Sequence, residues 1–272
     1  MKELFSIFLT QITVTFGVVL VFGLLISMFR KIFCRVAGKS GYWILLFSGL
    51  VGTPVHELSH ALMCVIFRHR IEEIKLYSPG NPDRTLGYVA HSYNKKSLYQ
   101  NVGHFFIGTA PITCGGLVIL LLMYLLSPEV YYSVSEVLGE GFTSALGAKD
   151  MASEFLQSLV GAARVIFRSE NFSSATFWVF MILAIMISSH MELSFSDIRS
   201  GFVGFTIISA LLFLADLVLW WVLPDTLTAF TEAIGGFSLY LAGFLGISVV
   251  FLALMVIVAL VVRLILSLFA RR

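Results

Sequence analysis

Six long apolar stretches constrain what this chain of 272 residues can fold into. A helix needs about 20 mostly apolar residues to cross the hydrocarbon core of a bilayer. The stretches cover residues 4–29, 42–67, 102–126, 175–191, 202–223 and 237–262. Only 12% of the residues are charged, against roughly 25% in soluble domains. We therefore expect an all-α membrane protein, a single polytopic domain over residues 1–272 with six transmembrane helices.

Two long connections hold most of the polar sequence. Residues 68–101 contain apolar-rich runs on either side of the turn-forming Ser-Pro-Gly-Asn-Pro-Asp at 78–83, a pattern typical of two strands joined by a loop. Residues 152–167 have apolar positions at helical spacing. We expect a short β-hairpin-like loop after the second span and an amphipathic helical loop after the third.

The distribution of Lys and Arg indicates an orientation. Six spans place both termini on one side, and 11 of the 18 Lys and Arg residues then fall on that side. Since loops rich in Lys and Arg stay in the cytoplasm, we expect a multi-pass integral protein of the plasma membrane with cytoplasmic termini. The four basic residues at 30, 31, 35 and 39 argue against this orientation.

Charge and cysteine content narrow the partners. The net charge is +2 and no block of like charges occurs, so we expect a lipid bilayer and no nucleic acid as partner. Cys34, Cys64 and Cys114 fit neither a C-x-x-C pair nor a disulfide framework. We interpret them as small apolar side chains. The sequence does not indicate an oligomeric state.

The second span contains the motif H-E-x-x-H at His56-Glu57-Leu58-Ser59-His60. Residues four apart share a helix face, so both imidazoles can bind one metal ion. Glu57 lies one position further round and can take a proton from a water that Zn²⁺ makes acidic. Because three ionisable groups at membrane depth are costly, we interpret the motif as a metal site, with a polar network or a proton relay as the alternative.

A third metal ligand must come from another part of the chain. His190, Glu192 and Asp197, at the end of the fourth span, are the candidates. Zinc ligands lie within roughly 4 Å of one another, whereas His190 and Asp197 would be about 10.5 Å apart on a continuous helix. We favour Asp197 as the ligand, with a helix N-cap as its alternative role. His190 is the alternative ligand, and we expect it rather to support the site or to contact substrate.

Three segments together carry a resemblance to a known family. They are His-Glu-Leu-Ser-His at 56–60, Gly-Thr-Ala-Pro-Ile-Thr-Cys-Gly-Gly at 108–116 and Ser-Asp-Ile-Arg-Ser-Gly at 196–201. In this order they resemble the site-2 protease family of intramembrane zinc metalloproteases, in its branch of small membrane metallopeptidases, over a core of about residues 42–205. The resemblance implies Zn²⁺ as cofactor, His56, His60 and Asp197 as ligands, and Glu57 as the catalytic base.

Small residues and one acid stand out in the other spans. We expect Gly108, Pro111, Gly115 and Gly116 to let the third span approach the second closely. Asp216 is isolated among apolar residues of the fifth span. An acid inside a membrane is a candidate functional group, although the sequence does not identify its partner.

The residues together predict an intramembrane zinc metalloendopeptidase, which hydrolyses a peptide bond in or near a transmembrane segment of another membrane protein. The strand expected at 86–93 either holds an extended substrate by main-chain pairing or is an ordinary hairpin strand; in the first case Tyr88 and His91 contact substrate. A catalytically inactive metal-binding scaffold is one alternative function, although a scaffold does not need Glu57. A metal or proton transporter is another, although ionisable residues aligned across several spans are scarce.

Overall fold

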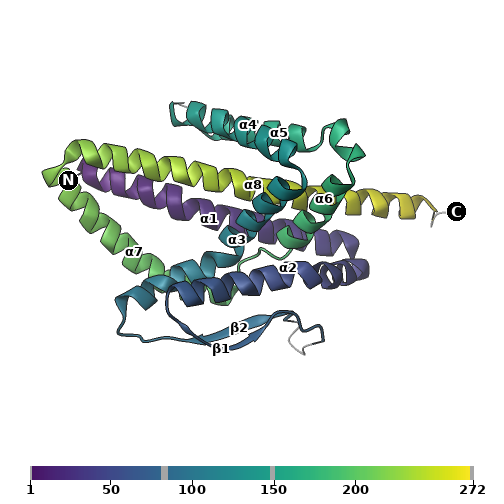
Figure 1. Ribbon diagram of the computed structural model, residues 1–272, viewed down its shortest axis with the longest axis horizontal. Coiled ribbons are helices and arrows are strands. Elements are labelled where there is room, and N and C mark those ends of the chain that lie inside the picture. Colours follow the sequence, from purple (N-terminus) through teal and green to yellow (C-terminus); the bar gives the residue numbers. More distant parts are fainter. Residues whose placement is uncertain (1, 81–84, 148–150, 270–272) are drawn as a thin grey trace.

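Long helices make up most of the structure, a computed structural model that describes residues 2–80, 85–147 and 151–269 (Figure 1). The elements are α1 (Lys2–Ala37), α2 (Lys39–Ile66), β1 (Arg70–Lys75), β2 (Tyr88–Ser92), α3 (Leu98–Leu126), α4 (Pro128–Gly147), α5 (Met151–Ile166), a short 3-10 helix η1 (Ser169–Ser173), α6 (Ala175–Ser188), α7 (Phe195–Val222) and α8 (Pro224–Phe269). The expectation of an all-α fold with one small hairpin is confirmed.

Four helices, α1, α3, α7 and α8, are long and apolar enough to cross a membrane, among the residues that the structure describes. They indicate an integral membrane protein. The helix α2 is not one of the four, and α6 has 14 residues, about 21 Å at 1.5 Å per residue, which is shorter than a hydrocarbon core of about 30 Å. The expectation of six spans therefore stays a prediction.

The polar and apolar faces of α2 are reversed relative to a helix on the surface of a soluble protein. Its inward face buries polar side chains, and its outward face exposes large apolar ones. The buried polar residues are Ser48, Thr53, Glu57, Ser59 and His60, and the exposed apolar residues include Trp43, Phe47, Leu50, Leu58, Leu62 and Val65. This pattern suits a helix with lipid outside and a polar site inside.

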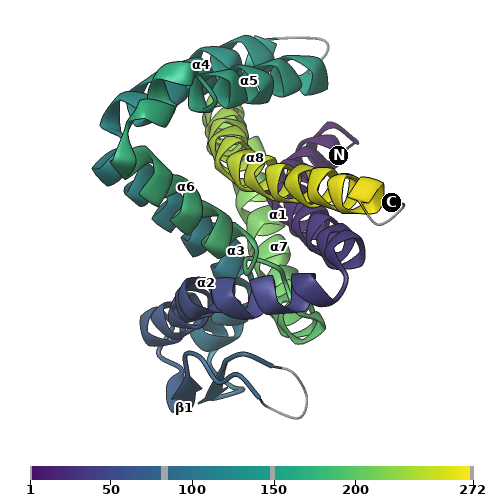
Figure 2. The same ribbon diagram turned by 90° about the vertical axis from the view of Figure 1, so that its right-hand side faces the viewer.

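The two long connections lie at opposite ends of the molecule. In both views the antiparallel β1–β2 hairpin lies beside α2, and the α4–α5 pair lies at the far end (Figures 1 and 2). The helix α5 coincides with the helical segment expected at 152–167. Between these ends, α1 packs along α8 and α3 packs along α7, so the core of the bundle separates the hairpin from the α4–α5 pair.

Glycines bring α3 close to the start of α7. A Cβ atom on Gly108 would lie 2.5 Å from the carbonyl oxygen of Asp197, and one on Gly204 would lie 2.5 Å from the amide nitrogen of Phe105. Such contacts require a residue without a side chain, as is common where membrane helices pack closely. The main chain of Asp197 can therefore lie directly against α3.

The expected role of three of these glycines in the approach of α3 to α2 is wrong. Gly108 faces α7, a Cβ atom on Gly115 would meet Met191 in the α6–α7 connection, and one on Gly116 would meet Leu245 of α8. Small residues in a sequence indicate that another helix packs closely at that position. Which helix packs there depends on the arrangement of the whole bundle.

We predict that Gly108→Ala lowers the free energy of unfolding by about 1–3 kcal/mol, a typical cost of overpacking. The added methyl group would meet main-chain atoms of α7, which cannot rotate away. Thermal unfolding in detergent measures the effect. Gly116→Ala is the matched control on the same helix, because its Cβ atom would lie 3.6 Å from Leu245, an ordinary contact. Equal stability of the two variants would contradict the prediction.

Candidate metal centre

The helix α2 presents His56 and His60 on one face, one turn apart, as the i, i+4 spacing predicts. Their Nε2 atoms lie 3.2 Å apart and their ring centroids 4.9 Å apart. The ring of His56 contacts the connection between α6 and α7, and the ring of His60 lies between α3 and the first turn of α7. The sequence therefore correctly predicts that the two imidazoles of the motif converge.

Main-chain carbonyls hold the other nitrogen of each ring. The Nδ1 atom of His56 lies 2.6 Å from the carbonyl oxygen of His190, and Nδ1 of His60 lies 2.8 Å from that of Ile107. A carbonyl only accepts, so each Nδ1–H donates, and in the neutral rings the two Nε2 lone pairs face each other. Lone pairs at this distance need a proton or a cation between them. Metal-bound histidines donate their second N–H to carbonyls in the same way.

Asp197 adds a carboxylate to the pair. Its Oδ1 atom lies 3.6 Å from Nε2 of His60, and one ligand atom each from His56, His60 and Asp197 all lie within 4.8 Å of one another. A carboxylate beside two imidazoles favours positive charge at their centre. These three residues could hold a metal ion.

Asp197 takes part in capping α7 with one carboxylate oxygen and faces His60 with the other. Ser194 is the N-cap of α7, and Asp197 occupies the third helical position of a capping box. Its Oδ2 atom accepts hydrogen bonds from the Ser194 amide at 2.9 Å and the Ser194 hydroxyl at 2.5 Å. The alternative that Asp197 is itself the N-cap is wrong. The cap uses one carboxylate oxygen and leaves the other facing His60, so it fixes the orientation of the carboxylate.

The ring of His190 points away from this group. Its Nε2 atom lies 3.0 Å from the hydroxyl of Ser48, and its Nδ1 atom lies 3.5 Å from that of Thr53. A Cβ atom on Gly52 would lie 2.5 Å from this ring, so α2 approaches it closely. His190 is not among the three clustered residues; its carbonyl oxygen orients His56 instead, which is the supporting role expected for it.

Glu192, the remaining ligand candidate, forms an ion pair with Arg30 of α1. This pair joins the α6–α7 connection to the N-terminal helix. The residues of the connection next to α6 are buried: Ser189, His190 and Met191. The connection is therefore fixed by burial next to α6 and by Arg30 and the capping box next to α7, and its main chain contacts the ring of His56 and the carboxylate of Asp197.

Glu57 is 6% exposed and lies beside the start of β2. A Cβ atom on Gly87, the residue before β2, would lie 2.8 Å from Cγ of Glu57 and 2.9 Å from Cγ2 of Thr53. Gly87 thus lets the hairpin approach the motif directly. Glu57 follows His56 directly in α2 and lies outside the clustered residues.

Tyr88 and His91, the expected substrate contacts, both lie on β2. Lys75 of β1 lies over the ring of Tyr88, 5.2 Å from its centroid. Burial, followed by the charges of His69 and His104, lowers the pKa of His91 to about 4, so its ring is neutral at pH 7. The Nδ1 atom of His91 lies 3.1 Å from that of His69. His91 therefore belongs to a cluster of imidazoles, and contact with a substrate stays a prediction for both residues.

The spacing of the ligand atoms suits a tetrahedral ion. Bonds of about 2.0–2.1 Å to zinc imply ligand atoms about 3.3 Å apart, close to the 3.2 Å and 3.6 Å separations along His56, His60 and Asp197. Sequence reasoning missed a second cluster in the described residues, Cys64, His69 and His91. A signal was present, since Cys64 continues the four-residue spacing of His56 and His60.

Comparison with family models, curated proteins and solved structures finds no match to this chain. Membership of the site-2 protease family therefore stays a prediction from the three sequence motifs, and the geometry of the metal centre stands on its own.

We predict that His56→Ala and Asp197→Ala each lose one equivalent of metal relative to the wild type, because each removes a ligand. His190→Ala keeps that equivalent, because the carbonyl oxygen that orients His56 is unchanged. Elemental analysis of detergent-purified protein after zinc loading measures the content. Loss of metal in His190→Ala, with retention in Asp197→Ala, would assign the third ligand to His190 instead.

Proposed function

We propose that this protein is an intramembrane zinc metalloendopeptidase, which hydrolyses a peptide bond in or near a transmembrane segment of a membrane protein. One observation carries the proposal: the Nε2 atoms of His56 and His60 face each other at 3.2 Å with both Nδ1 atoms engaged by carbonyls. A carboxylate, Asp197, adjoins this pair, and a second, Glu57, lies one residue from His56.

In the proposed reaction His56, His60 and Asp197 would hold the zinc ion. Bound zinc polarises a carbonyl group and lowers the pKa of water towards 7. Glu57 takes a proton from the attacking water and gives a proton to the amine that leaves. The capping box and the two main-chain carbonyls keep the ligands oriented while this proton moves. Glu57 is suited to the role of base because it lies beside the ligands and is not itself one of them.

We further propose that α2 and α6 complete a set of six spans. Like α2, the short helix α6 exposes apolar side chains, among them Trp178, Val179 and Ile182. Its continuation through Ser189 and Met191 is non-helical but buried. Non-helical backbone at membrane depth is tolerated where protein surrounds it. With cytoplasmic termini, the hairpin and the metal centre lie towards the cytoplasmic side of the plasma membrane.

Two features support a protein segment as substrate. A cavity of about 450 Å³ between α1, α3 and α7 is lined mostly by apolar residues, including Phe16, Phe105 and Phe205, and reaches Asp197. An apolar segment of another protein would suit such a lining. The second feature is Gly87, which places the start of β2 against Glu57. A substrate strand paired with β2 would therefore pass close to the base.

A transporter that uses Asp216 together with the metal centre is not favoured. Asp216 lies 19 residues after Asp197 on the continuous helix α7, roughly 28 Å along its axis. Its carboxyl group is fully buried beside Gln11 of α1. It is therefore separate from the metal centre.

We predict that Glu57→Gln keeps its metal and loses turnover by about 10²–10⁴-fold, the usual contribution of general acid–base catalysis. Purified protein in liposomes is mixed with solubilised bacterial membrane proteins, and mass spectrometry identifies new N-termini. New termini in or next to apolar segments are expected with the wild type and with the control Glu136→Gln, which changes an exposed carboxylate on α4. Products that persist with Glu57→Gln would remove Glu57 as the base. A zinc-loaded wild type that yields no products would favour the inactive metal-binding scaffold.

A further inference from the structure

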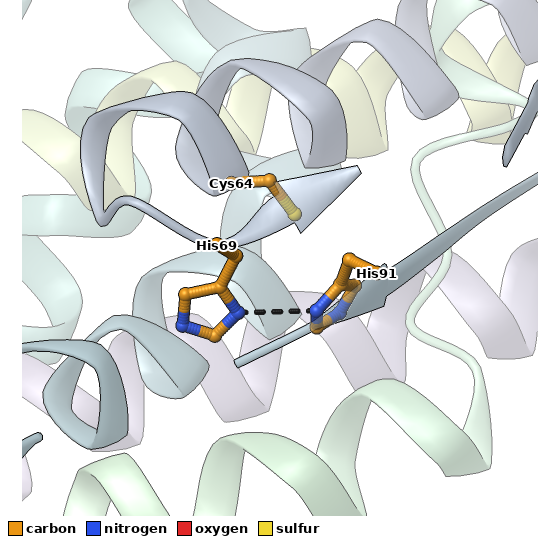
Figure 3. Close-up of side chains that lie close together, drawn as sticks. All are labelled: Cys64, His69 and His91. Atoms are coloured by element: carbon orange, nitrogen blue, oxygen red, sulfur yellow. Dashed lines mark hydrogen bonds between the residues drawn. The ribbon is translucent and has the colours of Figure 1, made fainter. Parts of the chain in front are cut away.

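A second cluster of metal-ligating side chains lies where α2 meets the hairpin. Cys64 comes from the last turns of α2, His69 from the residues that follow the helix and His91 from β2 (Figure 3). One ligand atom of each lies within 4.8 Å of the others. Cys64 is fully buried and His69 is 5% exposed, so these side chains meet inside the protein.

The turn that ends α2 brings Cys64 and His69 together. The amide of His69 donates to the carbonyl of Cys64 at 2.8 Å, and that of Arg68 donates to the carbonyl of Val65 at 3.1 Å. Arg68 has a φ of 59°. These are the features of a Schellman motif, which normally places two apolar side chains in contact at the positions of Cys64 and His69. Here the two positions carry a thiol and an imidazole, both of which bind metal.

Hydrogen bonding determines which ring nitrogen of His69 is free to bind a metal ion. Its Nε2 atom lies 2.9 Å from the carbonyl oxygen of Gln100 and donates to it, so in the neutral ring Nδ1 carries the lone pair. That lone pair faces Nδ1 of His91 at 3.1 Å. The separation is close to the roughly 3.3 Å between two nitrogens on one tetrahedral zinc ion. A carbonyl that holds the second nitrogen is the arrangement already found for His56 and His60.

A third imidazole beside the cluster lacks a partner. The ring of His104 is 6% exposed, and its centroid lies 5.1 Å from that of His69. Neither of its nitrogens has a hydrogen-bond partner within the part of the chain that the structure describes. A buried polar group without a partner is costly. A cation at the cluster would provide a ligand position for one of these nitrogens.

We propose that Cys64, His69 and His91 bind a second metal ion, Zn²⁺, with His104 in position to complete its coordination. Cysteine and histidine together are the ligands of structural zinc sites, and four of them close such a site. The ion would connect the end of α2 to β2, and so fix the hairpin that places Gly87 against Glu57. This site does not depend on the proposed peptidase activity, since it contains neither Glu57 nor Asp197.

Cobalt binding tests the second site separately from the first. Cobalt coordinated by a thiolate gives an intense near-ultraviolet charge-transfer band, and only the second site contains a cysteine. Detergent-purified protein is loaded with Co²⁺ and its absorption is recorded. The band is expected in the wild type, in His56→Ala and in Cys114→Ser, a matched control at another buried cysteine. It is expected to disappear in Cys64→Ser and to weaken in His91→Ala.

Zinc content gives the second readout. After zinc loading, about two ions per chain are expected in the wild type and about one in Cys64→Ser, with circular dichroism to establish that the variant is folded. No charge-transfer band in the wild type would overturn the proposal, whether or not any variant folds. A band that persists in Cys64→Ser would overturn it as well. A band that is kept in His56→Ala, together with an inactive wild type, would refute the peptidase and leave the second site in place.

Discussion

The break between α6 and α7 is the constraint on which the candidate metal centre depends. Within a membrane, main-chain groups without a helical partner must be satisfied inside the protein. In this connection the carbonyl of His190 accepts from His56, and the amide of Ser194 donates to Asp197. The hydrogen bonds that satisfy main-chain groups at the break therefore also orient one imidazole and one carboxylate. A continuous helix from α6 to α7 would satisfy its own backbone and would present neither of them in this way.

Close helix packing then brings the two halves of the centre together. The carbonyl of Ile107 in α3 fixes His60, while Gly108, the next residue, admits the main chain of Asp197. One turn of α3 thus positions a ligand from α2 and a ligand from α7. A side chain at position 108 would separate α3 from α7 where His60 meets Asp197, which explains the glycine at this position.

Local spacing could be predicted from the sequence, and contacts between distant segments could not. The convergence of His56 and His60 follows from helix periodicity alone. Asp197 could be proposed because His190, Glu192 and Asp197 are the residues of ligand type at the end of the fourth span. That one of its oxygens joins the cap while the other faces His60 depends on how α7 begins. The cluster with Cys64 was missed, because His91 reaches it only through the pairing of β1 with β2 and the turn at Arg68. A Cys-x₄-His spacing becomes meaningful once a Schellman motif is known to join the two residues.

Both clusters take residues from the inward face of α2, and this links the hairpin to the H-E-x-x-H motif. His56, His60 and Cys64 are each four residues apart on α2, so they form one row along its inward face. The row continues through the turn at Arg68 into β1, and β1 holds β2, whose preceding residue Gly87 contacts Glu57. The hairpin that follows α2 therefore packs back against the H-E-x-x-H motif of α2. Because a helix hides its carbonyls in its own hydrogen bonds, the proposed peptidase would require an extended substrate, and β2, which begins beside Glu57, is the edge strand with which such a substrate would pair.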